Sequence, residues 1–467
     1  MTEMIKSTCK VGSSLRVLLE AINEVPYGTA FIEDDTNKLV GIVTDGDFRR
    51  LLLNGKSLED QIQQSDLGTF VSALKGENFE SLLKKTNIKI NIVPIVNEKG
   101  ELIDFFEYKH KTKFTPVAEP TLENRELEYL LDAFSSTWIS SRGKYIDRFE
   151  DEFSTFCKVN HGVATSNGTV AIHLALVALG IGPGDEVIVP DLTFAATINA
   201  VLYANATPVI VDVDPITWTI SPEEIEKTIT SKTKAIIPVH VYGQACEMDK
   251  IMDIAQKHNL KVIEDCAEAH GAEFKGQRVG SFGDISTFSF FANKIITTGE
   301  GGMCVTNSDE LDTKMRKLRD HGMSKEKRYW HDDIGFNYRM TNLQAAIGCA
   351  QLEKIEWILD RNDQIERDYI KHLDHLNLFK WQKTYRQNRK VVWLMSCTTE
   401  KRKEVMEKLV ANNIDVRPFF YCLSEMPIYS KYSFSNKNAL KISKIGLNLP
   451  TVKNVDYKRI ENILREI

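Results

Sequence analysis

Residues 261–271 read KVIEDCAEAHG, a short apolar segment that ends on acidic and small residues. Val262 and Ile263 favour a β-strand, and Asp265 closes it. This strand belongs to a long alternation of apolar runs and helical patterns. Such an alternation predicts a mostly parallel sheet with helices on both faces. Because ligands of these sheets bind at the carboxyl ends of the strands, the pattern places Asp265 at a binding edge.

The elements around this strand define the expected α/β architecture. We expect helices near residues 169–179, 194–204, 247–258, 308–320 and 342–358, and strands at residues 187–189, 209–211, 235–239, 262–265 and 285–289. From about residue 370 the pattern changes to a strand at 390–397 and a helix at 401–412. The sequence therefore predicts a large domain over residues 113–370 and a small C-terminal α+β domain over residues 371–467.

Residues 1–112 predict a separate small α/β module. Strands at 30–32 and 39–43 precede a helix at 47–53, and a second strand–turn–strand pattern starts at residue 92. The module is therefore interpreted as an internal tandem. Residues 111–116 carry charge and a proline, which suits an exposed linker to the rest of the chain.

The composition excludes several classes of protein. The 467 residues carry a net charge of −6 with a pI near 6.0, which argues against a nucleic-acid or acidic-membrane partner. No apolar run is long enough to cross a bilayer, and no signal-type segment follows the first residues. The eight cysteines form no CxxC pair, and no cluster of histidine, cysteine and carboxylate residues is apparent. We therefore expect a cytoplasmic protein without a metal site.

Two short segments could bind parts of a cofactor. Residues 166–169 read SNGT and open the helix expected near residue 170. Backbone amides at a helix start bind phosphate, and a glycine permits close approach, although the same residues could form a simple N-cap. Asp265 could hold a pyridine nitrogen protonated, which makes that ring an electron sink, or it could cap the following segment.

Lys294 lies in the segment SFFANKIITTGEGG, residues 289–302. Apolar and aromatic neighbours desolvate a lysine and lower its pKa, which favours the free amine that bonds to a carbonyl carbon. A lone lysine is usually a surface charge. The flanking phenylalanines and the glycines just downstream favour a place in a cavity instead.

Two other motifs have simpler interpretations. Residues 180–184 (GIGPG) resemble a dinucleotide-binding loop, but they follow a helix and precede a strand, which is the reverse of the required order. Asp212 and Asp214 resemble a metal-binding pair, but Pro215 follows them, and we interpret them as a strand end and a turn.

Taken together, residues from about 116 to 467 resemble the DegT/DnrJ/EryC1/StrS family of sugar-nucleotide aminotransferases. The matching segments are residues 143–150, 166–169, 184–190, 239–244, 264–271, 289–302 and 335–346. The resemblance implies the aspartate-aminotransferase fold (type I), pyridoxal 5′-phosphate (PLP) as the cofactor, and a homodimer with shared active sites.

The resemblance also assigns roles by position. Lys294 would bond covalently to the cofactor and move protons, and Asp265 would pair with the ring nitrogen. Phe194 would stack on the ring, and Glu268 would lie near the phenolic oxygen, where many relatives carry glutamine or histidine. Gly168, Thr169 and Ser289 would bind the phosphate. Asn337 and Arg339 would reach into the active site from the second subunit.

The implied reaction transfers the amino group of L-glutamate to a 4-keto-6-deoxy sugar nucleotide for surface-polysaccharide synthesis. Glu268 and residues 293–302 favour GDP-4-keto-6-deoxymannose, which would yield GDP-perosamine, and UDP- and dTDP-linked ketones are alternatives. Related PLP-dependent sugar dehydratases typically carry histidine at the position of Lys294, which disfavours that reaction here. A nucleotide-sensing regulatory protein is a further alternative, which the complete catalytic set disfavours. After residue 420 the chain departs from many relatives, with Cys422 and Ser424 where they carry proline and histidine.

The front module resembles a pair of CBS domains. Residues 41–47 (GIVTDGD) match a nucleotide-binding strand and loop, in which Thr44 and Asp47 would contact ribose and phosphate. The second copy, residues 102–107 (LIDFFE), lacks this threonine–aspartate pattern, so the resemblance implies at most one good site. The alternative is a structural or dimerising module that binds no regulatory nucleotide.

Overall fold

The computed structural model describes residues 7–23, 28–86, 90–108, 114–384, 387–432 and 436–467. The chain divides into two compact units, Met1–Phe114 and Thr115–Ile467. Residues 111–113 of the predicted linker, and with them the predicted border after residue 112, lie outside the described residues. The border predicted near residue 370 stays a prediction.

The first unit contains the predicted tandem as two three-stranded sheets. The first copy consists of β1 (Thr8–Lys10), α2 (Leu15–Asn23), β2 (Thr29–Glu33), β3 (Leu39–Thr44) and α3 (Asp45–Leu53), and the second of β4 (Ala73–Leu74), α4 (Phe79–Lys84), β5 (Ile92–Val96) and β6 (Leu102–Glu107). In both sheets the first pair of strands is parallel and the second pair is antiparallel. Helix α3 starts two residues earlier than predicted because the Thr44 side chain caps it.

The second unit is built on a seven-stranded sheet with the order β7-β15-β14-β11-β10-β8-β9. Its strands are β7 (His161–Thr165), β8 (Glu186–Pro190), β9 (Thr207–Val211), β10 (Thr233–Ile236), β11 (Lys261–Asp265), β14 (Ile285–Ser289) and β15 (Gly302–Thr306). Within the described chain, β15 is the one strand of this sheet that runs against its neighbours. The predicted mostly parallel sheet is confirmed.

Both faces of this sheet are buried. Along β8, Ile188 joins one hydrophobic cluster, while Val187 and Val189 join another. Because successive side chains of a strand point to opposite faces, the two clusters lie on the two sides of the sheet. This explains why the strands are continuous apolar runs in the sequence instead of alternating ones.

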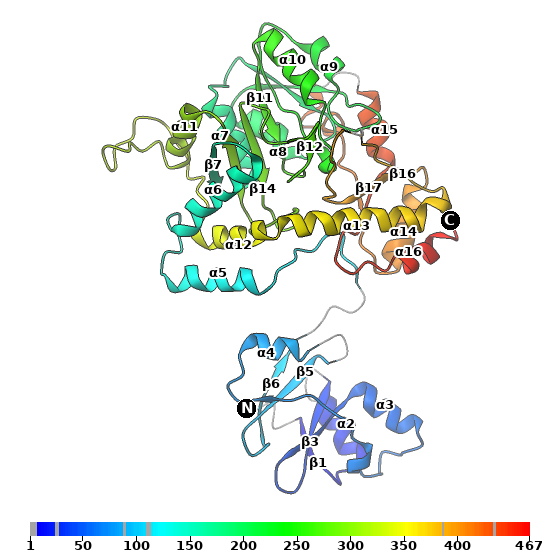
Figure 1. The fold of residues 1–467 in the computed structure, drawn as a ribbon. Helices are drawn as coiled ribbons and strands as arrows, with labels where there is room; N and C mark the ends of the chain where they lie inside the picture. Colours follow the sequence, from blue (N-terminus) through cyan, green and yellow to red (C-terminus); the bar gives the residue numbers. More distant parts are fainter. Residues whose placement is uncertain (1–6, 24–27, 87–89, 109–113, 385–386, 433–435) are drawn as a thin grey trace. The chain divides into compact units, whose positions relative to one another are not determined.

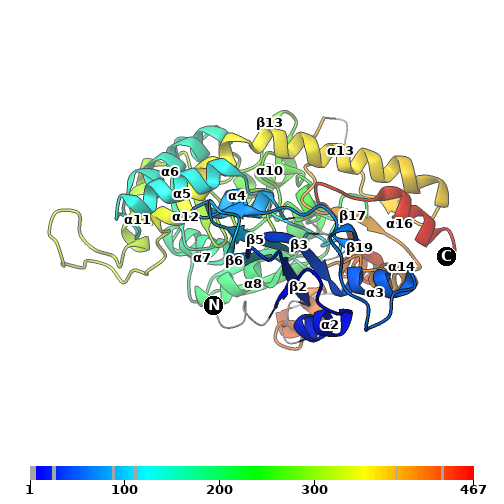
Figure 2. The same cartoon turned by 90° about the horizontal axis from the view of Figure 1, so that it is seen from below.

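Helices supply the apolar faces that cover the sheet. Those that contact its strands are α6 (Lys144–Cys157), α7 (Gly168–Ala178), α8 (Ala195–Tyr203), α9 (Pro222–Thr228), α10 (Met248–His258) and α11 (Asp309–Arg319). The unit also contains α5 (Asn124–Ser135), α12 (Asn342–Glu353) and α13 (Ile355–Leu373). Helix α12 packs against α5 and α6, and the three helices lie together in both views (Figures 1 and 2).

The single helix predicted at residues 342–358 is wrong. The chain forms two helices that meet at Lys354, and the second continues to Leu373. Lys354 has a non-helical backbone (φ −112°, ψ 14°), and its ammonium lies 2.7 Å from the Glu126 carboxylate of α5. The break therefore coincides with an ion pair to a helix more than two hundred residues earlier in the chain.

The C-terminal part of this unit forms an antiparallel sheet with the order β16-β17-β19-β18. Its elements are β16 (Lys380–Trp381), β17 (Met395–Thr398), α14 (Arg402–Ala411), β18 (Arg417–Pro418), α15 (Lys437–Ile445), β19 (Gly446–Leu449) and α16 (Tyr457–Leu464). The strand predicted at 390–397 starts only at Met395. Before it, the Val391 amide donates to the Gly243 carbonyl and the Val392 carbonyl accepts from Asn362, so these groups bond to other segments instead of a neighbouring strand.

Among the residues that the structure describes, no helix combines the length and apolar character needed to span a bilayer.

Candidate active site

A cavity of about 770 Å³ lies at the carboxyl ends of the parallel strands, where the sequence places the ligand. The residues predicted from the sequence that line it are Gly168, Thr169, Phe194, Asp265, Glu268, Ser289 and Lys294. They come from segments far apart in the sequence, which the sheet brings to one edge.

One corner of the cavity is suited to a phosphate. Gly168 is the first residue of α7, and Asn167 caps the helix by accepting from the Val170 amide at 3.0 Å. The first amides of a helix have no acceptor within the helix and carry partial positive charge. A Cβ at position 168 would lie 2.8 Å from the Ser289 Cβ, so glycine is needed for α7 to approach the end of β14 this closely. The N-cap and the phosphate interpretations are therefore compatible.

Asp265 ends β11 as a buried carboxylate. It accepts from the Thr197 hydroxyl at 2.9 Å and from the Ala267 amide at 3.2 Å, which leaves lone pairs for a further donor in the cavity. Burial raises the pKa of this carboxyl. No helix begins between β11 and α11 in the fully described residues 266–308, so the alternative role of Asp265 as a helix cap is wrong.

The Lys294 side chain is only 12% exposed, so it is not a surface charge. Its Nζ lies 4.0 Å from the centre of the Trp393 ring and 3.8 Å from Oε1 of Glu268. Burial lowers the pKa of Lys294, against the opposing effect of the Glu268 and Asp265 carboxylates. The amine therefore loses its proton more readily than an exposed lysine does.

Glu268 is the second carboxylate beside this amine. Its Oε2 accepts from the Tyr242 amide at 2.7 Å, and burial raises its pKa to about 7. This carboxyl consequently changes its protonation state in the neutral range, where catalytic proton transfers are most effective.

Phe194 precedes α8 and presents its ring to the cavity, with the Phe420 ring centroid 5.7 Å away. Sequence reasoning did not assign roles to several other lining residues: Thr197, Tyr242, Trp393, Arg417 and Phe420. Tyr242 lies in the matching segment 239–244, but that segment contains no pattern that specifies a contact. Trp393 lies in residues 390–397, which the sequence predicts as a regular strand without a functional role.

Asn337 and Arg339 do not line this cavity. Arg339 donates to Asn337 at 3.0 Å and forms an ion pair with Asp320 at 2.8 Å. Their assignment to the active site of a second subunit stays a prediction.

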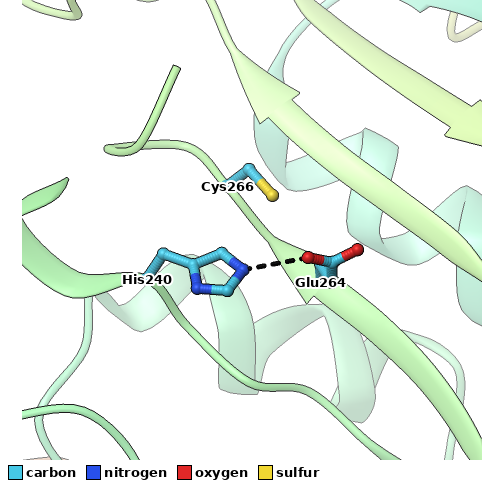
Figure 3. A group of neighbouring side chains, drawn as sticks. All are labelled: His240, Glu264 and Cys266. Carbon is cyan, nitrogen blue, oxygen red and sulfur yellow. Dashed lines mark hydrogen bonds and ion pairs between the residues drawn. The ribbon is translucent and has the colours of Figure 1, made fainter. Parts of the chain in front are cut away.

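His240, Glu264 and Cys266 form a buried group near the end of β11, shown in Figure 3. The sequence gives no sign of this group, whose potential metal-ligand atoms lie within 4.8 Å of one another. The Glu264 carboxylate is already occupied, because it binds His240 at 3.1 Å and accepts from the following donors: the Gly280, Phe282 and Gly283 amides and the Ser286 hydroxyl. Burial alone would raise the pKa of Glu264, but these partners outweigh it and lower the pKa. The arrangement is a satisfied hydrogen-bond network that fixes the end of β11.

In the first unit, Thr44 and Asp47 form a capping box at the junction of β3 and α3. The Thr44 amide donates to Asp47 at 3.0 Å, and Thr44 is exposed. Asp47 also pairs with Arg50 of the same helix. The second copy has no such junction in the described chain, because no helix follows β6 before α5.

Two sequence families match the chain. Residues 120–467 match the sequence model of the DegT/DnrJ/EryC1/StrS aminotransferase family. The chain belongs to this family. Residues 2–54 match the model of the CBS domain.

Individual aminotransferases of this kind align over nearly their whole length. GDP-perosamine synthase of Escherichia coli O157:H7 is 46% identical over 76% of this chain and 98% of its own, and that of Caulobacter vibrioides is 47% identical over 74% and 96%. Among solved structures, an aminotransferase from Psychrobacter cryohalolentis is 30% identical with a TM-score of 0.71, covering 76% of this chain and 98% of its own. A sugar aminotransferase from Streptococcus pneumoniae in its PLP form is 25% identical with a TM-score of 0.71, covering 76% and 97%.

The residues in the cavity fit PLP, on which aminotransferases of this family depend. A desolvated amine at Lys294 would suit the aldehyde of that cofactor, a buried carboxylate at Asp265 its ring nitrogen, and the glycine at the start of α7 its phosphate. The protein is a PLP-dependent aminotransferase of the type I fold, as the sequence predicts.

We expect Lys294→Ala to lose covalent attachment of PLP and at least about 10²-fold of the turnover, because proton transfer by a positioned side chain contributes that much or more. Borohydride reduction followed by peptide mass spectrometry checks the attachment. Lys275→Ala, which changes an exposed lysine, is the control and should be labelled at Lys294 like the wild type. Labelling of another lysine together with retained turnover in Lys294→Ala would contradict the assignment.

We expect Glu268→Gln to remove a pH-dependent step near pH 7 from the rate at which the apoenzyme captures PLP. Above pH 7 the Glu268 carboxylate raises the pKa of Lys294, so its loss should increase the neutral amine and speed capture about tenfold. Stopped-flow absorbance over a series of pH values measures this rate. Glu300→Gln, at the exposed rim of the same cavity, should keep the wild-type profile. An unchanged step in Glu268→Gln would assign the titration to another group.

Proposed function

We propose that this aminotransferase moves the amino group of L-glutamate to C4 of a 4-keto-6-deoxy sugar nucleotide, with GDP-4-keto-6-deoxymannose preferred. The product, GDP-perosamine, would enter surface-polysaccharide synthesis. The observation that carries the proposal is the 46–47% identity to two GDP-perosamine synthases over 96–98% of their length.

The side chains of the cavity suit both halves of this transfer. Bound PLP supplies an electron sink and carries the amino group between the two substrates. Asp265 holds the ring nitrogen protonated, and Lys294 moves the proton between cofactor and substrate carbon. Glu268 sets the charge beside that amine. Burial lowers the pKa of this amine, so it is neutral and able to accept a proton at a lower pH than an exposed lysine would be.

The cavity also offers a place for anionic substrates. Its volume lies within the ~300–1,000 Å³ that hold cofactors with small-molecule ligands. Arg417 lines it with an exposed guanidinium, 3.7 Å from Asp415. This guanidinium suits the carboxylate of glutamate or the diphosphate of the sugar nucleotide.

We expect GDP-4-keto-6-deoxymannose to give a kcat/KM at least about tenfold above those of the dTDP- and UDP-linked 4-keto-6-deoxy sugars, because a site built for one base leaves polar groups unpaired with another. A coupled assay that follows 2-oxoglutarate formed from L-glutamate measures this. Lys294→Ala serves as the blank. Preference for a UDP- or dTDP-linked ketone would overturn the GDP assignment, and dehydration without amino transfer would favour the dehydratase alternative.

We further propose that two chains form a dimer that shares its active sites. Helix α5 and the residues after it expose an apolar stripe at helical spacing, made up of Leu127, Leu131, Phe134 and Trp138. Contiguous exposed apolar surface of this kind marks an interface. Asn337 and Arg339 stand outside the cavity of their own chain, which leaves them available to the partner's cavity.

We expect a heterodimer of one Lys294→Ala chain and one Arg339→Ala chain to regain activity. One of its two sites then combines Lys294 of one chain with the partner's wild-type Arg339, whereas each parent homodimer lacks an intact site. Two affinity tags isolate the heterodimer, and the assay above measures it. A pure heterodimer as inactive as its parents would show that Arg339 acts within its own chain.

The first unit suits a nucleotide at the junction of β3 and α3. An exposed hydroxyl at Thr44 and a half-buried carboxylate at Asp47 suit ribose, and the start of α3, with Arg49 and Arg50 in the same helix, suits phosphate. This junction occurs once in the described part of the unit, which supports a single site. We propose that nucleotide binding there regulates the aminotransferase.

We expect calorimetry of the whole chain to detect one of AMP, ATP, GMP, GDP or CMP, and the double variant Thr44→Ala, Asp47→Ala to lose the signal. Regulation requires a coupling of about 1–3 kcal/mol between the two sites, so the same nucleotide should change the apparent KM several-fold or more. Thr36→Ala, in an exposed turn of the same unit, is the control. Binding without a kinetic effect would leave a docking or dimerising module.

A further inference from the structure

A buried carboxylate fastens the C-terminal part of the second unit to the end of β8. Asp191 directly follows β8 and has no exposed surface. Its Oδ1 accepts from the Ser424 amide at 2.8 Å and its Oδ2 from the Ser424 hydroxyl at 2.6 Å. Asn436 donates to the same Oδ2 at 3.0 Å, and the Leu423 amide donates to the Asp191 carbonyl at 3.0 Å. Three side-chain and backbone donors thus converge on one buried carboxylate.

The residues that follow Asp191 connect it to the lining of the cavity. Thr193, two residues on, shares a hydrogen bond with Thr197 at 3.1 Å, and Thr197 donates to Asp265. Phe194 follows and presents its ring to the cavity. The end of β8 is therefore linked to the cavity through Thr193, Thr197 and Asp265, and this link does not involve the C-terminal segment.

On its other side the carboxylate holds the segment that begins with Arg417 and Phe420, both of which line the cavity. The Phe420 amide donates to the Tyr242 hydroxyl at 2.9 Å, and its ring lies 5.7 Å from that of Phe194. Leu423 and Ser424, three and four residues after Phe420, attach this segment to the end of β8 through the Asp191 carbonyl and carboxylate.

A second strand end repeats the arrangement. Asp212, directly after β9, accepts from the Asn438 amide at 2.9 Å and the Ala439 amide at 2.8 Å, at the start of α15. A carboxylate at a helix start stabilises it. Asp214 instead accepts from the Ile216 and Thr217 amides in a turn, as the sequence predicts for this pair. Two strand-end residues therefore anchor residues 423–424 and 436–439.

We propose that Asp191 and Ser424 are positioning residues that set the gap between the Phe194 and Phe420 rings and so control which molecules can reach the bound cofactor. The Asp191 carboxylate fixes the position of the segment that follows Phe420. The cofactor would be bound by other residues, at the start of α7, at the ends of β11 and β14, and by Lys294.

The alternative is that Ser424 only stabilises the fold of its segment. Other contacts hold that segment as well, because Leu423 and Tyr429 are buried in the core and the Tyr429 hydroxyl donates to Asn199 at 2.6 Å. Removal of one hydroxyl therefore leaves the segment attached and changes its freedom near Phe420. The positioning role and the purely structural role differ in how fast a wide and a narrow reagent would reach the bound cofactor in a Ser424 variant.

The test compares hydroxylamine with O-benzylhydroxylamine, which attack the bound PLP by the same reaction but differ in width. The PLP-loaded full chain is mixed with each reagent, and the rate of cofactor absorbance change is recorded for wild type, Ser424→Ala, Ser424→Thr and the control Ser430→Ala. The Ser430 hydroxyl is exposed and bonds only to the Pro427 carbonyl, so it probes the same segment without the carboxylate.

Ser424→Ala should raise the rate with O-benzylhydroxylamine about tenfold, as expected for loss of one hydrogen bond to a charged group. The rate with hydroxylamine and the dissociation constant of PLP should stay within about twofold, because a narrow probe and the cofactor do not depend on the gap. Ser424→Thr, which keeps the hydroxyl, and Ser430→Ala should behave like the wild type. Equal acceleration of both reagents in Ser424→Ala, or weakened PLP binding, would overturn the proposal in favour of a structural role.

A double-mutant cycle with Phe420→Ala locates the effect. The widened gap in Phe420→Ala should already admit the large reagent, so adding Ser424→Ala should produce no further acceleration. Additive effects would show that Ser424 acts elsewhere. If Ser424→Ala does not fold, Asn436→Ala removes the other side-chain donor to Asp191, and the same selective acceleration, or its absence, decides the question.

Discussion

The chemistry proposed for this protein depends on one amine and two carboxylates whose side chains are buried at the same cavity. Lys294, Asp265 and Glu268 each have a pKa displaced by burial, the amine downwards and the carboxyls upwards. In water the three would be fully charged at neutral pH. In the cavity the cost of burying a charge brings the proton affinities of Lys294 and Glu268 closer together, which is the condition for passing protons between neighbouring groups.

Such a cluster needs a rigid support, and the parallel sheet supplies it. Glu264 points away from the cavity, where it binds His240 and the loop of residues 280–283, while Asp265 points into it. Because side chains alternate along a strand, these adjacent acidic residues point to opposite sides, so that one fixes the strand end while the other lines the cavity. A charge change at Glu264 would be felt at the cofactor site without any direct contact to it.

Local sequence patterns were sufficient to predict the sheet and to single out Gly168, Asp265 and Lys294, which line the cavity. The resemblance to the family was needed for the other lining residues, Phe194, Glu268 and Ser289. Asp265 and Gly168 could be found because a strand end and a helix start each have a recognisable local signature. Trp393 and Phe420 could not, because their positions depend on hydrogen bonds between segments that lie 100 residues or more apart, such as Trp393 to Asn293 and Phe420 to Tyr242. The same reason explains the helix break at Lys354 and the late start of β17.

The eight cysteines are all unpaired and all buried, from Cys9 in the first unit to Cys422 beside the active-site segment. Burial raises the pKa of most of them, so few thiolates are available to react in the folded protein. A single cysteine introduced at an exposed position such as Leu53 would then be the one thiol that a maleimide dye labels readily. The chain is in this sense already a background for labelling one chosen position with a fluorescent dye.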